Sequence, residues 1–247
     1  MSTDSDKGPT FSISNSAAPS TTVVAGFSAF GLAGLTAVDF LVDHLELEET
    51  GHLSAEYLPS ITPFESGRPR HHSRFFSRPD LDLTVFVNEL FLPTPVADSF
   101  ADTLLTWTDK HDVSEILVLS GIPYAHGPDE HDTFYVASDD YRERRLDDTD
   151  IQPMGRGFLD GVNGALMYRG IESNLRTAVF ITPVHAQVPD VPAAIRLVET
   201  FDRVYDLGVD AGPLEEFSRT VEQYYKDLAA RLEAVDDRQM PEDRMYM

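Results

Sequence analysis

The chain has 247 residues, 42% of them hydrophobic and 10% aromatic, which suffices for one sizeable core or two small ones. It contains no cysteine, which excludes disulfides, thiolate metal sites and cysteine nucleophiles and fits a reducing cytosol. The 42 acidic and 19 basic residues give a formal net charge of −23. Such a field repels phosphate backbones and anionic lipid heads, so we expect neither nucleic acid nor a membrane surface as a partner.

The basic residues are almost all arginine, because lysine occurs only at Lys7, Lys110 and Lys226. The acids are spread between apolar segments instead of forming one block, which argues against charge-driven disorder. At roughly 1 M salt the Debye length is about 3 Å, so an acidic chain of this kind hardly repels itself. We therefore expect a halophilic protein that works in a salty cytosol.

The first part of the chain predicts a disordered segment followed by strands and one helix. Residues 1–20 are rich in Ser, Thr, Pro and Asp and predict disorder. The apolar run from Val23 to Val42 is long enough to span a bilayer. A membrane span is nevertheless not expected, because the run contains glycines and Asp39 and lacks a flanking basic cluster. These features favour a buried strand at 21–26, a glycine turn and a helix at 32–45. Strand-like runs follow at 54–58, 70–76 and 83–88.

The next part alternates helices and strands. Thr94 as N-cap and Pro95 at the first helical position predict a helix over 94–111. Strands are predicted at 115–123, 133–138 and 176–184, and helices at 139–146, 157–171 and 189–207. This order predicts one α/β domain over residues 21–211, with a mostly parallel or mixed central sheet flanked by helices.

The last part predicts a long C-terminal helix over 212–235 and a flexible tail over 236–247. Apolar residues in the helix follow each other by three or four positions: Leu214, Phe217, Val221, Tyr224 and Leu228. This seam packs either on the body of its own domain or against another subunit, and both interpretations stay open.

Three glycines, Gly26, Gly31 and Gly34, mark the first strand-to-helix turn. Their spacing is G-x4-G-x2-G, which differs from the dinucleotide pattern G-x-G-x-x-G, and no P-loop lysine follows. The glycines therefore predict a tight turn and close helix–sheet contact. An anion or small-ligand site at the start of the helix is the alternative.

The loop "YAHGPDEHD" at 124–132 gathers side chains that bind divalent metals. His126 and His131 stand there with Asp129, Glu130 and Asp132. No helical pair of histidines accompanies them, and acids occur throughout this chain. We therefore expect a solvated loop and no metal site.

Candidates for catalysis are few. Ser120 lies at a predicted strand end before Gly121, where α/β enzymes place functional residues, but no G-x-S-x-G motif is present and no partner base can be named. His71 and His72 are neighbours in a strand-like run and should face opposite sides. We expect no catalytic residue and no cofactor.

Four segments stand in a set order along the chain: "VVAGFSAFGLAGLTAVDFLV", "GFLDGVNGALMYRGIESNLRTAVFITPV", "PDVPAA" and "DLGVDAGPLEE". Together they resemble the proteasome-assembly-chaperone family, in the branch similar to its second chaperone subunit and the archaeal relatives of that subunit. The resemblance covers roughly residues 22–230. It implies a nucleoside-phosphorylase-like α/β fold, a non-enzymatic and ATP-independent role, a cytoplasmic archaeal protein and a homo-oligomer.

The chain ends in Met245, Tyr246 and Met247. Archaeal members of the family that act on the proteasome resemble its regulatory ATPases in ending with a hydrophobic residue, a tyrosine and one further residue. The resemblance therefore implies that this tail docks on the outer-ring subunits of the proteasome core particle. Two alternatives stay open, namely a small-molecule enzyme on a phosphorylase- or hydrolase-like fold and an oligomeric scaffold.

Overall fold

The structure is a computed structural model, and it describes residues 8–58, 60–123, 131–185, 189–216 and 218–219. The chain divides into two compact units, Met1–Val209 and Asp210–Met247. In the second unit, residues 212–216 and 218–219 are helical, at the start of the helix predicted over 212–235. Most of that helix and the whole tail, including Met245, Tyr246 and Met247, lie outside the described residues, so those predictions stay predictions.

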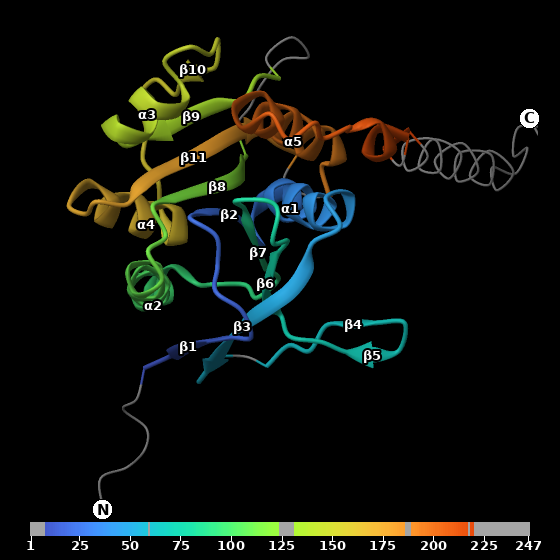
Figure 1. The fold of residues 1–247 in the computed structure, drawn as a ribbon, viewed down its shortest axis with the longest axis vertical. Coiled ribbons are helices and arrows are strands. Elements are labelled where there is room, and N and C mark those ends of the chain that lie inside the picture. The colour runs from blue at the N-terminus through green and yellow to red at the C-terminus, as the bar shows by residue number, and fades with distance from the viewer. Residues whose placement is uncertain (1–7, 59, 124–130, 186–188, 217, 220–247) are drawn as a thin grey trace, which may run out of the picture. The chain divides into compact units, whose positions relative to one another are not determined.

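The first unit is built on a nine-stranded sheet with the strand order β1-β3-β6-β7-β2-β8-β11-β9-β10 (Figure 1). Its strands are β1 (Thr10–Asn15), β2 (Thr22–Phe27), β3 (Glu48–Glu56), β6 (Ser73–Ser77), β7 (Thr84–Asn88), β8 (Glu115–Ile122), β9 (Phe134–Ala137), β10 (Gln152–Pro153) and β11 (Arg176–Pro183). A separate hairpin pairs β4 (Phe64–Glu65) with β5 (Arg68–Pro69).

Four parallel strands, β7, β2, β8 and β11, form the centre of this sheet. Antiparallel pairs flank them, with β6 beside β7 and β9 beside β11. Every residue of β2 and β7 is buried, as expected for strands that are covered on both faces. The prediction of an α/β domain with a mostly parallel or mixed central sheet is confirmed.

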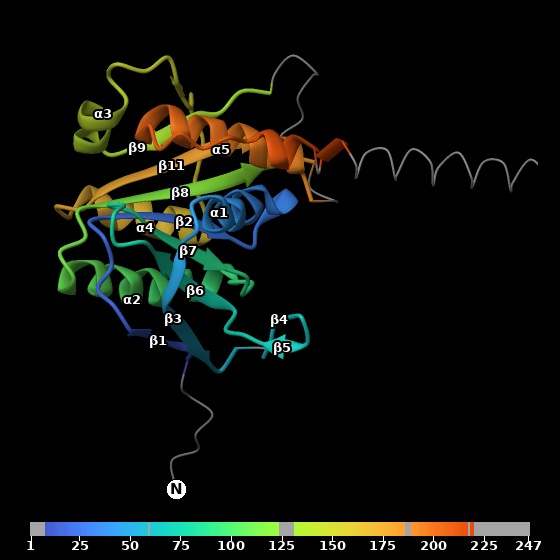
Figure 2. The same ribbon diagram turned by 45° about the vertical axis from the view of Figure 1, so that its right-hand side comes forward.

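Helices cover both faces of the sheet (Figure 2). On one face, α1 (Ala33–His44) packs against α5 (Val191–Tyr205), and on the other α2 (Ala97–Lys110) packs against α4 (Gly161–Ile171). The 3₁₀ turns η2 (Phe30–Leu32) and η3 (Thr94–Val96) lead into α1 and α2, and α3 (Asp139–Arg145) follows β9. The apolar run at 23–42 thus forms β2, η2 and α1, as predicted. Among the described helices, none is both long and apolar enough to cross a bilayer.

Aromatic side chains form the core between the sheet and α2. Phe75 of β6 and Phe86 of β7 stack with ring centroids 4.3 Å apart, and Trp107 of α2 lies 4.6 Å from Phe75. Phe100 of α2 meets Phe27 of β2 edge to face at 5.8 Å. Such pairs add directional attraction to the burial of large apolar surface, so they set the position and orientation of α2 on the sheet.

Strand β1 corrects the prediction that residues 1–20 are disordered. Residues 10–15 pair in antiparallel register with β3, from Thr10 opposite Glu56 to Asn15 opposite Gly51. Phe11 faces inward and meets Phe100 edge to face at 5.4 Å. The strand forms because its alternating polar and apolar residues offer one side to the core and the other to water.

Candidate functional site

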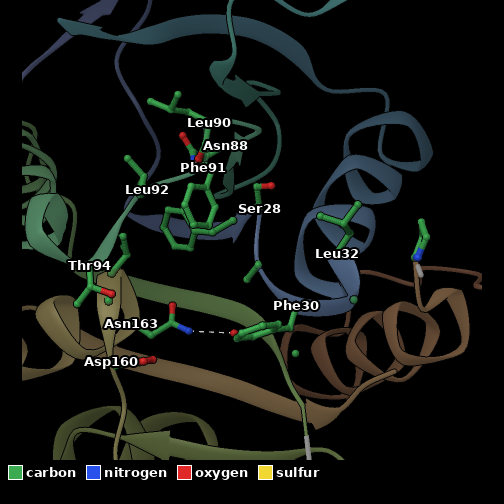
Figure 3. A pocket seen from close by; sticks show the side chains of 18 residues that line it. Ser28, Phe30, Leu32, Asn88, Leu90, Phe91, Leu92, Thr94, Asp160 and Asn163 are labelled. Atoms are coloured by element: carbon green, nitrogen blue, oxygen red, sulfur yellow. Dashed lines mark hydrogen bonds between the residues drawn. The ribbon is translucent and has the colours of Figure 1, made fainter. Parts of the chain in front are cut away.

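A cavity of about 570 Å³ lies where three neighbouring parallel strands end (Figure 3). β2 ends at Phe27 and is followed by Ser28, β7 ends at Asn88, and Ser120 lies near the end of β8. The N-terminal end of α4 supplies Asp160 and Asn163 from the other side. β2 leads to α1 on one face, whereas β7 leads to α2 on the other face, so the cavity sits where the connections diverge. In open α/β sheets this is the usual place for a ligand.

The polar groups of the cavity belong to a hydrogen-bonded floor. The side chain of Asn163 donates from Nδ2 to Oγ of Ser120 at 2.9 Å, which is the dashed line in Figure 3. Asn88 is fully buried, accepts a hydrogen bond from Ser73 at 2.6 Å and donates one to the carbonyl oxygen of Leu90 at 2.8 Å. These bonds restrict the side chains of the floor to one arrangement.

Two exposed phenylalanines border the same cavity. Phe30 in η2 is 59% exposed and Phe91 is 69% exposed, whereas Phe27 of the same lining is buried. Large exposed aromatic side chains that line one concave site are characteristic of binding surfaces. The site therefore combines a polar floor with an aromatic border.

The glycines Gly26 and Gly34 have the packing role that the sequence predicted. A Cβ atom at Gly34 would overlap the carbonyl oxygen of Leu119 in β8, and a Cβ atom at Gly26 would overlap the carbonyl oxygen of Gly34. The absence of side chains lets α1 lie directly on β2 and β8. Neither glycine lines the cavity.

Gly31 has a different role, because it does line the cavity. It adopts a positive φ of 65°, which favours glycine, and a Cβ atom there would lie 2.9 Å from Val184. It makes the turn of η2 that leads the chain from β2 into α1. Of the three predicted glycines, only this one therefore stands at a possible ligand site.

Ser120 lies at the end of β8, as predicted, and its hydroxyl faces the floor of the cavity. Its partner is the amide of Asn163, which cannot act as a general base. The described part of the lining contains no histidine, lysine or arginine. This arrangement suits binding through hydrogen bonds and gives no support to a serine nucleophile.

The histidines lie elsewhere and do not form one ligand set. The ring of His71 stacks on His52 with centroids 3.7 Å apart, while Nδ1 of His72 lies 2.6 Å from Oγ of Ser73. Loss of hydration upon burial, followed by the charge of His71, lowers the pKa of both His52 and His72. His71 and His72 thus have separate partners, as the sequence predicted.

Most of the loop at 124–132 lies outside the described residues. Of its five candidate metal ligands, the structure describes only His131 and Asp132. His126, Asp129 and Glu130 are not among the described residues. Within the described ranges, no group of three or more His, Asp or Glu side chains is placed to hold a metal ion.

The segment "PDVPAA" forms the start of α5. Asp190 is its N-cap, is 5% exposed, and accepts a hydrogen bond from the backbone N–H of Ala193 at 3.0 Å. The backbone N–H of His185 donates to Asp190 at 2.7 Å, and Nδ1 of His185 lies 2.8 Å away. Burial disfavours the carboxylate, but these hydrogen bonds outweigh it and lower the pKa of Asp190. The backbone N–H of Asp190 donates to the carbonyl oxygen of Gly31, so a hydrogen bond joins the start of α5 to a residue that lines the cavity.

Comparison with protein families defines the class of this molecule. The PAC2 family matches residues 23–229, which include the central sheet except β1 and the first residue of β2, and the chain belongs to this family. A sequence search of curated proteins gave no significant match.

Several solved structures share the fold over nearly their full length. PbaA of Pyrococcus furiosus, an archaeal homologue of proteasome-assembly chaperone, is 19% identical with a TM-score of 0.85, covering 93% of this chain and 95% of its own. PbaB of the same organism, an archaeal proteasome activator, is 16% identical with a TM-score of 0.74, covering 89% and 99%. A proteasome-assembly-chaperone homologue of Mycobacterium tuberculosis is 18% identical with a TM-score of 0.63, covering 90% and 97%. At these identities the likeness concerns the fold.

Several residues of the cavity were not predicted from the sequence. Asn88, Asp160, Asn163, Phe30 and Phe91 come from three separate segments, at positions 30, 88–91 and 160–163, and only the fold brings them together. A signal was present in one case, because Asn88 is the polar residue that ends the buried apolar strand "TVFVN".

Proposed function

We propose that this protein is an ATP-independent assembly chaperone or activator of the archaeal proteasome. The observation that carries the proposal is the PAC2 family match over residues 23–229. Structures of the same fold include proteins described as a homologue of proteasome-assembly chaperone and as a proteasome activator. The protein would act in the cytoplasm of a halophilic archaeon, as a homo-oligomer and without a cofactor.

The C-terminal tail would provide the contact with the proteasome. Met245, Tyr246 and Met247 would enter a pocket between outer-ring subunits of the core particle. The ring of Tyr246 would be buried while its hydroxyl finds a polar partner, Met245 would fill an apolar gap, and the terminal carboxylate of Met247 would pair with a basic group.

Salt concentration and oligomeric state would both affect the affinity of the tail for the core particle. In concentrated salt only contact-range ion pairs keep their strength, so burial of the tyrosine ring must provide most of the affinity. One three-residue contact is weak. Several tails on one oligomer would bind a ring of identical pockets with higher avidity.

The test is a pulldown of purified core particle at high KCl concentration. Deletion of Met245–Met247 and the substitution Tyr246→Ala should each abolish binding, because both remove the buried ring. Tyr168→Ala is the matched control, since Tyr168 is 65% exposed on α4, and it should bind like the wild type. Light scattering should show the same oligomer for all variants.

Unchanged core-particle binding by the deletion variant would refute docking through the tail. A second measurement tests the family-level proposal itself. If no proteasome subunit co-purifies with the full chain from its native host, the assignment to the proteasome fails as well, whatever the tail does.

A further inference from the structure

The proposed docking through the tail does not use the cavity at the carboxyl ends of β2, β7 and β8, yet this cavity is built like a ligand site. We propose that it binds a small aromatic compound that is uncharged or cationic and carries N–H or O–H donors. Its volume of about 570 Å³ falls within the range of about 300 to 1,000 Å³ that is usual for small-molecule pockets.

The charge of the lining selects against anions. Asp160 supplies a carboxylate, and the described lining residues include no lysine, arginine or histidine that would offset it. Asp160 is the N-cap residue of α4, and its side chain makes no capping hydrogen bond. The net charge of −23 strengthens the preference for neutral or cationic ligands.

The side chains of the lining offer several hydrogen-bond acceptors. Because Nδ2 of Asn163 is engaged with Ser120, Oδ1 of Asn163 is the group of this amide that can still accept a bond from a ligand. The carboxylate of Asp160 accepts only, and the hydroxyls of Ser28 and Thr94 in the same lining can accept too. A ligand rich in N–H or O–H donors would therefore satisfy this set.

The aromatic border predicts the flat part of the ligand. Phe30 and Phe91 are 59% and 69% exposed. A ring placed against either one would bury apolar surface on both partners and gain the attraction between aromatic rings. The fixed floor below them requires little rearrangement on binding, which reduces the entropic cost of association.

Tyramine and 3-(4-hydroxyphenyl)propionate are suitable probes, because they share a phenol and a two-carbon chain and differ in the charged end group. Calorimetric titration of the full chain should show tyramine binding at millimolar or lower concentration. Binding of the acid should be weaker by about fivefold or more, which corresponds to one contact-range charge interaction near water.

Two variants and two matched controls locate the site. Phe91→Ala should weaken tyramine binding by about three- to tenfold through the loss of one aromatic contact. Asp160→Asn should reduce the preference for tyramine over the acid. Phe64→Ala and Asp109→Asn should change neither, because Phe64 is a 75% exposed phenylalanine on the β4–β5 hairpin and Asp109 is an exposed acid of α2.

All four positions are on the surface, and circular dichroism should show that each variant keeps the fold. The proposal is overturned if tyramine does not bind, if it binds no better than the acid, or if Phe91→Ala and Asp160→Asn both behave like the wild type. Core-particle binding, measured in parallel, should be the same for all four variants, so failure of the cavity and failure of the tail can be told apart.

Discussion

Replacing Glu115 by glutamine should destabilise the fold by about 3 kcal/mol, because it leaves two arginines without their shared carboxylate. Glu115 starts β8, and its side chain is fully buried. Nε of Arg145 in α3 donates to Oε1 at 3.0 Å, and Nε of Arg176 in β11 donates to Oε2 at 3.2 Å. The hydroxyl of Tyr205 in α5 donates to Oε1 at 2.7 Å. Four elements thus meet at one carboxylate.

The magnitude follows from the burial of the partners. Removing one member of a buried ion pair costs about 3 to 5 kcal/mol, because the remaining charge stays unpaired in a poorly hydrated place. Arg145 and Arg176 are 25% and 23% exposed, so water can partly replace the lost carboxylate, and the lower end of that range applies. For a domain of about 200 residues this corresponds to a fall in Tm of about 6 to 12 °C.

The measurement is thermal and denaturant unfolding of the full chain at constant KCl concentration. Glu143→Gln is the control, since Glu143 is an exposed acid of neighbouring α3, and it should stay within about 0.5 kcal/mol of the wild type. Asp150→Asn breaks the exposed pair with Arg203 and should cost no more than about 1 kcal/mol. A Glu115→Gln variant as stable as these two would show that the buried carboxylate is not what joins the four elements.

Two further substitutions test the packing and the capping described above. Gly34→Ala should cost about 2 kcal/mol or more in unfolding free energy, because the added methyl group meets the backbone of Leu119. Gly155→Ala is the control and should cost far less, because the space around Gly155 is open. Equal stability of the two variants would contradict the close contact at Gly34. Asp190→Asn should cost about 1 kcal/mol at pH 7 by removing a charge that accepts hydrogen bonds in the folded state. The pKa of Asp190 is lowered by folding, so its contribution exists above the unfolded pKa of about 3.9 and disappears as the pH falls through the folded value. The stability difference between wild type and Asp190→Asn should therefore shrink below about pH 4, and a difference that does not depend on pH would refute this account.

The central strands and the helices could be predicted because each is specified by its own residues. The strand "TVFVN" consists of β-branched and aromatic residues up to its last residue, and Pro192, two residues after the N-cap Asp190, marks the start of α5. Predicted boundaries agree with the observed ones to within a few residues in most of these elements. β1 was missed because Ser, Thr and Asn in residues 10–15 resemble a disordered leader in composition, although their alternation with Phe11 and Ile13 indicates a strand.

The cavity could be predicted only in part, since its geometry depends on which strands are neighbours. Gly31 and Ser120 could be identified from local sequence, one at a turn and one at a strand end. The pairing of Ser120 with Asn163 spans 43 residues and arises because β8 ends, and α4 begins, at the same edge of the sheet. No local pattern records that proximity, so the aromatic and amide residues of the site became apparent only with the strand order.

The proposed tail contact and the proposed ligand site depend on different physical interactions and therefore respond differently to salt. Tail docking would rely on burial of Tyr246, which concentrated salt does not weaken, whereas the proposed preference of the cavity for cations would rely on Asp160, which is exposed. Raising the KCl concentration should therefore reduce the difference between tyramine and its acid analogue while leaving core-particle binding nearly unchanged. If the two activities instead fell together, the cavity and the tail would be parts of one mechanism, and ligand binding would then have to be considered as a regulator of the contact with the proteasome.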